Sequence, residues 1–189
     1  MLSHYFELRV ISQIEITEVE VINQVMQSLH QILVNQKGNI AISFPCYKLR
    51  KTVGGVIRLF GSEQELQKIK IDIQQKSSIS DYALLTSVAK VPSTIKGYLR
   101  FRRFNPKNKS SLRRAEERLT AQGKWTPEVK NRLIEKWGNG DLQYPYFHLN
   151  SKSTEQRFIL WLKREKCSEP VQGIFNSYGL SQTATVPDF

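Results

Sequence analysis

The chain contains three histidines, His4, His30 and His148, and histidine is the side chain best suited to accept a proton at neutral pH. His30 follows Leu29, an apolar position of a predicted helix, and therefore lies about 100° around that helix from the core-facing side. A residue on this flank can reach a cleft between the helix and another part of the protein. Taken alone, His30 fits a structural or exposed histidine better than a catalytic one, and His148 and His4 give weaker indications still.

The acidic residues do not suggest metal-dependent phosphoryl transfer, because they are scattered and form no pair of the DxD type. The sequence also lacks the GxxxxGK[ST] loop that binds nucleotide phosphates. If such a chain cuts nucleic acid, we expect it to cut without a metal ion. RNA permits this reaction, because its 2′-OH is a built-in nucleophile. That reaction needs a base near the hydroxyl, a group that positions the hydroxyl, and cations on the phosphate.

Two polar segments in the C-terminal third could supply the positioning group. The first runs from Ser151 to Thr154 after a predicted strand, and Gln156–Phe158 opens the next strand. The second is Asn176–Ser181, near the end of the chain. Judged by local pattern alone, these segments are a polar hairpin loop and a turn that ends a strand.

Positive charge is concentrated between Lys96 and Arg118, where nine of 23 residues are Lys or Arg and only Glu116 and Glu117 oppose them. This segment supplies +7 of the formal net charge of +11, and both flanks are nearly balanced. Aromatic residues are interleaved with the cations. Such a run is costly in a compact protein unless it faces a polyanion, so nucleic acid is the first candidate partner.

Composition sets the broad class of the protein. A length of 189 residues, 40% of them hydrophobic, allows one large domain or two small ones. Cys46 and Cys167 form no CxxC or Cys/His cluster, so we expect reduced thiols and no zinc site. The N-terminus has no signal pattern, and no apolar run approaches the length of a membrane span. We therefore expect a cytoplasmic protein without a metal or other cofactor.

The first half of the chain follows a regular pattern of elements. A capping box at Thr17 opens an amphipathic helix that is predicted to end near Lys37-Gly38. A second helix is predicted over Ser62–Gln75, and the four predicted strands are His4–Ile11, Asn39–Phe44, Val56–Phe60 and Leu84–Val91. The order βαββαβ over residues 1–95 predicts a ferredoxin-like (RRM-like) domain.

The second half, residues 96–189, is predicted to be a separate domain with a basic helix and a small antiparallel sheet, which makes the fold class α+β. A helix is expected over Ser111–Ala121, and Thr126 caps another with Pro127 at its first position. The predicted strands of this half are Tyr144–Leu149, Gln156–Lys163 and Ile174–Tyr178.

Taken together, these segments resemble a known family in family order and over nearly the whole chain. The matching motifs are Ser28-Leu29-His30-Gln31, Ile42-Ser43-Phe44-Pro45, Phe101-Arg102-Arg103-Phe104-Asn105, the helix with Arg113 and Arg114, Ser151-x-Ser153-Thr154-x-Gln156-x-Phe158, and Ser177-Tyr178-Gly179-Leu180-Ser181. The chain resembles the CRISPR repeat-processing endoribonucleases of type I-F (Ypest) systems, the crRNA-maturation subunits of the Csy surveillance complex.

The resemblance implies a definite activity. Such enzymes bind the hairpin of a CRISPR repeat and cut once at the 3′ base of its stem, without a metal. They leave a 2′,3′-cyclic phosphate and a 5′-OH, and they stay on the crRNA 3′ hairpin with the other subunits of the surveillance complex. Carried over by position, His30 would act on the 2′-OH, Ser151 would position that hydroxyl, and Tyr178 would orient His30.

The resemblance also implies an RNA interface. Phe158 matches an aromatic residue that stacks on the terminal base pair beside the cut, and Arg103 and Asn105 match an Arg-x-Gln pair that reads base edges. Asn at position 105 shortens that reach by one methylene group, and the adjacent Arg102 leaves the register open by one residue. The remaining RNA-binding residues that we expect are Lys107, Lys109, Arg113, Arg114, Arg118 and Ser153.

Several alternatives stay open at the level of sequence. A catalytically silent hairpin-binding subunit would use the same basic segment, although the joint presence of His30, Ser151 and Tyr178 argues against it. A general RRM-type module lacks its signature in Val56–Phe60, and a ribosomal-protein-like role leaves the ordered motifs unexplained. The basic loop Cys46–Gly55 could contact RNA or a protein, or it could be a solvated connection.

Overall fold

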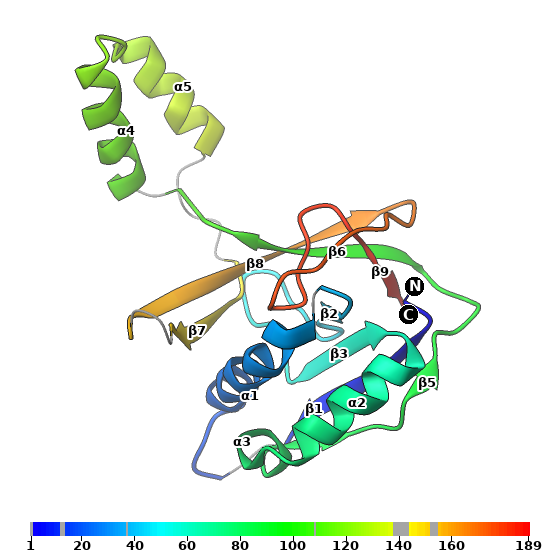
Figure 1. Ribbon diagram of the computed structural model, residues 1–189. Helices are drawn as coiled ribbons and strands as arrows, with labels where there is room; N and C mark the ends of the chain where they lie inside the picture. The colour runs from blue at the N-terminus through cyan, green and yellow to red at the C-terminus, as the bar shows by residue number, and fades with distance from the viewer. Residues whose placement is uncertain (1, 12–13, 37, 108, 138–143, 152–154) are drawn as a thin grey trace.

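The computed structural model describes residues 2–11, 14–36, 38–107, 109–137, 144–151 and 155–189. Within these ranges the fold is α+β, with two antiparallel sheets and helices beside them (Figure 1). This agrees with the predicted fold class and is consistent with a ferredoxin-like arrangement of the first half. None of the helices in the described ranges is long and apolar enough to cross a membrane.

The first sheet has the order β2-β3-β1-β4, with every neighbouring pair antiparallel. Its elements along the chain are β1 (His4–Val10), α1 (Glu18–Leu33), β2 (Ala41–Ser43), β3 (Val56–Gly61), α2 (Glu63–Gln74) and β4 (Ala83–Leu85). This order is the one that two interleaved βαβ units produce. The apolar faces of α1 and α2 contribute fully buried side chains to the hydrophobic core that the helices share with this sheet.

Capping boxes begin both helices, as the sequence predicts. Before α1, the Thr17 hydroxyl accepts the N–H of Glu20, whose carboxylate accepts the N–H of Thr17 in return. Ser62 and Glu65 make the same exchange before α2. Each box satisfies donors that a helix N-terminus otherwise leaves without partners. A short 3-10 turn, η1 (Val34–Gln36), continues α1 almost to the predicted end.

The prediction of one strand over Leu84–Val91 is wrong. The segment forms two short strands, β4 and β5 (Ala89–Lys90), which both pair with β1. Between β4 and β5, the Thr86 hydroxyl accepts a hydrogen bond from the main-chain N–H of Glu7 on β1. A side chain thus takes the place of a main-chain acceptor in the pairing with β1. A short helix that the sequence did not predict, α3 (Ser77–Ser80), precedes β4.

The second sheet has the order β7-β8-β6-β9. Its strands are β6 (Gly97–Phe104), β7 (Tyr146–Asn150), β8 (Arg157–Cys167) and β9 (Val186–Asp188). β6 takes up the first part of the basic segment Lys96–Arg118, and this part was not predicted to be a strand. The predicted strand Ile174–Tyr178 is wrong, because this segment forms a turn in which the Asn176 side chain takes up main-chain donors.

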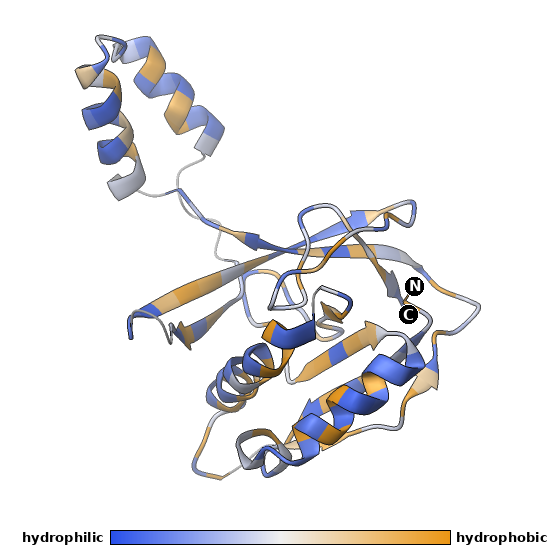
Figure 2. Ribbon diagram, in the orientation of Figure 1, coloured by the Kyte–Doolittle hydropathy of each residue, from blue (hydrophilic) through white to orange (hydrophobic). Residues whose placement is uncertain are grey.

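Aromatic residues join the two sheets into one core. Phe44, just after β2, packs edge-on against Phe101 of β6 at a centroid distance of 5.4 Å and in a tilted arrangement against Phe147 of β7 at 5.5 Å. The Tyr47 hydroxyl donates to the main-chain carbonyl of Leu162 on β8. Figure 2 shows that apolar and polar residues are interspersed along the strands of both sheets.

Two helices, α4 (Lys109–Ala121) and α5 (Pro127–Trp137), form a hairpin that projects away from both sheets (Figure 1). Ala115 of α4 is buried, whereas no residue of α5 is. Exposed side chains therefore dominate the hairpin, which connects to the sheets only through the segments around it. We call this α4–α5 hairpin the arm.

Candidate active site and RNA interface

A pair of hydrogen bonds fixes α1 along the edge strand β7. Asn23 and Gln27 accept the main-chain N–H groups of His148 and Asn150, at 2.9 and 2.7 Å respectively. Four helical residues rise about 6 Å and two strand residues about 6.8 Å, so the two spacings match closely. His30 comes one turn after Gln27 on α1, and Ser151 comes directly after Asn150 at the end of β7. The Gln27–Asn150 hydrogen bond therefore brings His30 and Ser151 to the same end of the contact between α1 and β7.

A tight turn presents Tyr178 to the same place. The side-chain oxygen of Asn176 accepts the N–H groups of Tyr178 at 2.8 Å and Leu180 at 3.2 Å, and Gly179 takes a left-handed φ of +67°. The Gly179 carbonyl accepts the N–H of Ile42 on β2 at 2.8 Å. The turn is therefore anchored to the first sheet rather than left as a free loop.

The imidazole of His30 is held on two sides. Its ring stacks on Tyr178 with a centroid distance of 3.9 Å and an interplanar angle of 7°. Its Nδ1 lies 2.9 Å from the main-chain carbonyl oxygen of Ser177. A carbonyl can only accept, so Nδ1 carries the proton in this contact and Nε2 of the neutral ring is the basic nitrogen. The arrangement is that of a general base oriented by its neighbours.

Tyr178 itself is not suited to act as the base. Burial raises the pKa of its phenol, and the nearby charge of Arg103 offsets this only in part, so the net shift is upward from 10.0. The phenol therefore stays protonated at neutral pH. Its ring is stacked on the His30 imidazole, and an aromatic π-face attracts a cation such as imidazolium.

These residues line a cleft with a volume of about 660 Å³. Its lining consists of Gln27, His30, Gln31, Val34, Arg103, Asn150, Ser151, Gln156, Arg157, Phe158 and Tyr178. Among the described residues, the lining thus brings together the three predicted catalytic residues with two arginines and no carboxylate. Within the described ranges, His, Cys, Asp and Glu side chains form no cluster of three or more that could hold a metal ion.

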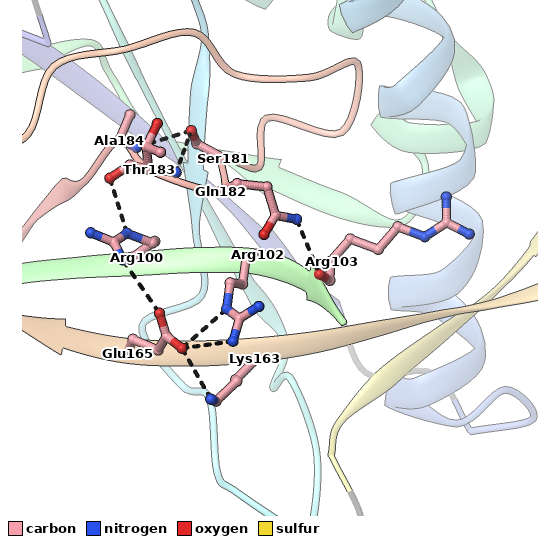
Figure 3. A network of polar contacts seen from close by, with 9 residues as sticks. All are labelled: Arg100, Arg102, Arg103, Lys163, Glu165, Ser181, Gln182, Thr183 and Ala184. Carbon is pink, nitrogen blue, oxygen red and sulfur yellow. Dashed lines mark hydrogen bonds and ion pairs between the residues drawn. The ribbon is translucent and has the colours of Figure 1, made fainter. Parts of the chain in front are cut away.

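The neighbouring residues Arg102 and Arg103 point to opposite faces of β6 (Figure 3). Arg103 lines the cleft, where its guanidinium carbon lies 5.9 Å from the centroid of the Phe158 ring. Arg102 instead pairs with Glu165 at 2.9 Å on the other face. The alternation of a strand accounts for the difference, because adjacent side chains face opposite ways. Of the neighbours Arg102 and Arg103, it is therefore Arg103 that lies at the cleft.

The other predicted RNA-binding residues that the structure describes are not part of the cleft lining. Asn105 and Lys107 follow β6, and the Lys107 ammonium lies 5.7 Å from the Trp137 ring centroid. Lys109 is the first residue of α4, which also carries Arg113, Arg114 and Arg118. Ser153 lies outside the described residues.

The arginines of α4 differ in their surroundings. Arg113 pairs with Glu117 one turn later at 3.4 Å, and both side chains are largely exposed. Arg114 donates to the carbonyl of Ser110 within the same helix. Arg114 and Arg118 are exposed on the projecting arm. The cleft and the arm thus form two separate cationic surfaces.

Sequence reasoning missed some of the residues that build the cleft. Gln27 was not among the predicted site residues, although the polar pair Asn23 and Gln27, four positions apart on an amphipathic helix, is a signal of contact with another element. Arg157 was read only as part of a strand, yet it adds a second cation to the cleft. Neither role is visible without the pairing of α1 with β7.

A cleft that holds an imidazole on two sides together with two arginines, and a separate basic arm, are features typical of a protein that acts on RNA. Comparison with known proteins agrees with this class. The family described as CRISPR-associated protein (Cas_Csy4) matches residues 5–189. The chain therefore belongs to the Cas_Csy4 family, and it is a CRISPR-associated endoribonuclease.

Two similar proteins match this chain over their whole lengths. The protein named CRISPR-associated endonuclease Cas6/Csy4 in Escherichia coli (strain UTI89 / UPEC) is 32% identical over 190 residues, covering 100% of both chains. The protein of the same name in Pseudomonas aeruginosa (strain UCBPP-PA14) is 27% identical over 191 residues, again covering 100% of both.

Proposed function

We propose that this protein binds the repeat hairpin of a CRISPR precursor RNA and cuts it at the 3′ base of the stem without a metal ion. His30 is the general base, Ser151 positions the attacking hydroxyl, and Tyr178 orients the imidazole. The observation that carries the proposal is the His30 ring, which is held between the Ser177 carbonyl and the Tyr178 ring at the wall of a cleft that also contains Ser151 and two arginines.

The reaction follows from the tautomer of His30. Nε2 accepts the proton of the 2′-OH, and the 2′ oxygen attacks the adjacent phosphorus while the bond from phosphorus to the 5′ oxygen breaks. The leaving oxygen takes up a proton, which leaves a 2′,3′-cyclic phosphate and a 5′-OH. The Ser177 carbonyl and the Tyr178 ring both favour the imidazolium formed in the first step.

Two arginines of the cleft are placed to meet the charge of the phosphate. Arg103 and Arg157 line the cleft beside Ser151, and the pocket contributes no opposing carboxylate. Cations that face the phosphate stabilise the negative charge that builds up on its oxygens in the transition state. Phe158, half-buried under Arg103, supplies the ring that stacks on the last base pair of the stem.

The rest of the hairpin is held by the arm and its connection. Arg103 and Asn105 read base edges near the bottom of the stem, with Arg103 rather than Arg102 as the reader because Arg102 is engaged by Glu165. The exposed arginines of α4 contact phosphates along the stem, which accounts for an arm with few apolar contacts.

This reading also fixes a domain organisation. Residues 1–95 form a ferredoxin-like domain that carries His30, and residues 96–189 form the RNA-binding domain with the arm and the second sheet. Because both domains line the cleft, neither can cut alone. After cleavage the protein keeps the crRNA 3′ hairpin and joins the other subunits of a type I-F surveillance complex.

The proposal is tested by separating cutting from binding in His30→Ala. We expect this variant to lose cleavage of the repeat hairpin while its affinity stays within about twofold of wild type, because the histidine contributes a proton transfer and not a phosphate contact. His148→Ala is the matched control, since His148 is an exposed histidine on the outer side of β7. It should cut at the wild-type rate.

The alternative outcome is equally definite. Full-rate cutting by His30→Ala would remove the proposed mechanism. Tight binding of the hairpin by wild-type protein with no cutting at all would instead make the chain a silent hairpin-binding subunit.

A further inference from the structure

An aromatic row crosses the outer face of the second sheet, on the side away from the cleft. The register places Tyr146 of β7 opposite Trp161 of β8, and Trp161 opposite Phe104 of β6. Residues that pair directly in antiparallel strands share one face. The Tyr146 and Trp161 rings lie 4.6 Å apart between centroids, and Tyr146 is 40% exposed.

A row of cations lies beside the aromatic row. Two positions further along the strands, Arg102 stands opposite Lys163, and two further on Arg100 stands opposite Glu165. All three cations converge on the single carboxylate of Glu165, at 2.9 to 3.5 Å (Figure 3). One carboxylate cannot balance three cations, so this part of the face remains positive.

The combination identifies the chemistry of a partner. Aromatic rings in a row with flanking cations form the kind of surface on which successive bases of a single strand stack while the cations meet the backbone. Exposed Ile159 and His148 extend the same face along β7 and β8. A purely apolar protein interface would not need a positive row at its border.

The two faces of the sheet also suggest which strand lies there. Phe158 and Arg103 face the cleft, whereas Trp161 and Phe104 face the opposite side. The RNA strand that is cut leaves the stem through the cleft past His30. The sheet separates that path from the outer face, so the other strand at the base of the stem, the one 5′ of the hairpin, is the one that can cross the aromatic row.

We propose that the outer face of the β7-β8-β6 sheet binds the single-stranded RNA immediately 5′ of the repeat hairpin, with Tyr146 and Trp161 as stacking residues and Lys163 on the backbone. The inference rests on the proposed function, since it assumes that the hairpin occupies the cleft and the arm. It extends the RNA footprint from the stem to the guide side of the processed RNA.

The test compares two RNAs: the minimal hairpin, and the same hairpin with an unstructured 5′ extension of about ten nucleotides. In wild-type protein we expect the extension to tighten binding roughly tenfold at physiological salt. Tyr146→Ala should remove most of this gain and leave binding and cutting of the minimal hairpin unchanged, whereas Tyr146→Phe should keep it. Leu84→Ala, an exposed apolar residue on β4 of the other sheet, is the matched control.

A hairpin with an equal 3′ extension and a 2′-deoxy nucleotide at the cut separates the two flanks. Equal gains from the 5′ extension in wild type and Tyr146→Ala, or a Tyr146-dependent gain from the 3′ extension only, would overturn the inference. No gain from the 5′ extension would do the same and would leave the face to a protein partner. Failure to bind the minimal hairpin would refute the proposed function instead.

Discussion

The His30 imidazole and the Tyr178 phenol ring lie parallel, with centroids 3.9 Å apart and planes 7° apart. They come from positions nearly 150 residues apart in the chain, one on α1 and the other on a turn near the C-terminus. The contact exists because Asn176 and the Gly179–Ile42 hydrogen bond hold the turn against β2. The stacking of the His30 ring therefore depends on contacts between distant parts of the chain.

The stacked pair predicts a difference between two substitutions of Tyr178. Tyr178→Ala removes the ring that orients His30 and supports its imidazolium, and we expect single-turnover cleavage to slow about tenfold, as a cation–π contact of this strength would give. Tyr178→Phe keeps the ring and should stay within about threefold of wild type. A large loss in Tyr178→Phe would mean that the hydroxyl, rather than the ring, is what matters.

Phe158 is expected to set the position of the cut. Loss of its ring in Phe158→Ala removes a stacking contact of roughly 1–3 kcal/mol on the terminal base pair. Cleavage should slow about tenfold or more, and cut sites should spread by one nucleotide when mapped on a denaturing gel. Phe158→Tyr should restore both rate and position. Unchanged kinetics in Phe158→Ala would assign the ring to the core alone.

Arg114 on the projecting arm is expected to contact a phosphate. Arg114→Ala should weaken hairpin binding uniformly and reduce the slope of log affinity against log salt by about one. Lys68→Ala, which removes one charge from α2, should leave the slope unchanged and controls for net charge. A wild-type slope in Arg114→Ala would place this arginine off the RNA.

Glu7 makes stability depend on acid pH. It is buried on β1 and accepts from Arg58 at 2.8 Å and from Arg9 at 2.7 Å. Burial by itself raises the pKa of the Glu7 carboxyl. The hydrogen bonds and charges of Arg58 and Arg9 lower this pKa by more than burial raises it, so the net pKa lies below the ordinary value of 4.5. The stabilisation is therefore complete above the unfolded-state pKa and is lost as pH falls through the folded-state value.

Glu7→Gln removes the carboxylate charge that pairs with the buried Arg58 and should cost roughly 3–5 kcal/mol of unfolding free energy at neutral pH. In urea titrations its deficit relative to wild type should shrink as the pH is lowered into the range where the Glu7 carboxyl takes up its proton. Glu116→Gln, an exposed change on α4, should match wild type at every pH. A deficit that stays constant with pH would show that shape, not charge, explains the effect.

Local signals predicted most of the first sheet and its helices. Thr17 and Ser62 begin α1 and α2 as their capping boxes indicate, because a cap is decided by residues three apart in the chain. The split of the last strand into β4 and β5 was not predictable, because it depends on the Thr86 hydroxyl meeting Glu7, which is 79 positions away.

The sequence analysis did not predict strand β6, because the arginines of this segment obscure its alternation of apolar and polar residues. Leu99 and Phe101 point into the core at every second position, while arginines occupy the positions between them. The site shows the same limit. His30, Ser151 and Tyr178 were identified from motifs, but their meeting at one cleft depends on the hydrogen bonds of Asn23 and Gln27 with β7, which no local pattern encodes.

The most direct test of the mechanism uses the repeat RNA in excess EDTA, beside a copy with a 2′-deoxy nucleotide before the expected cut. We expect the normal RNA to be cut at the 3′ base of its hairpin at an unchanged rate, and the deoxy copy to bind equally tightly and stay intact. Loss of cutting in EDTA, or cutting of the deoxy copy, would contradict attack by the 2′-OH with His30 as its base.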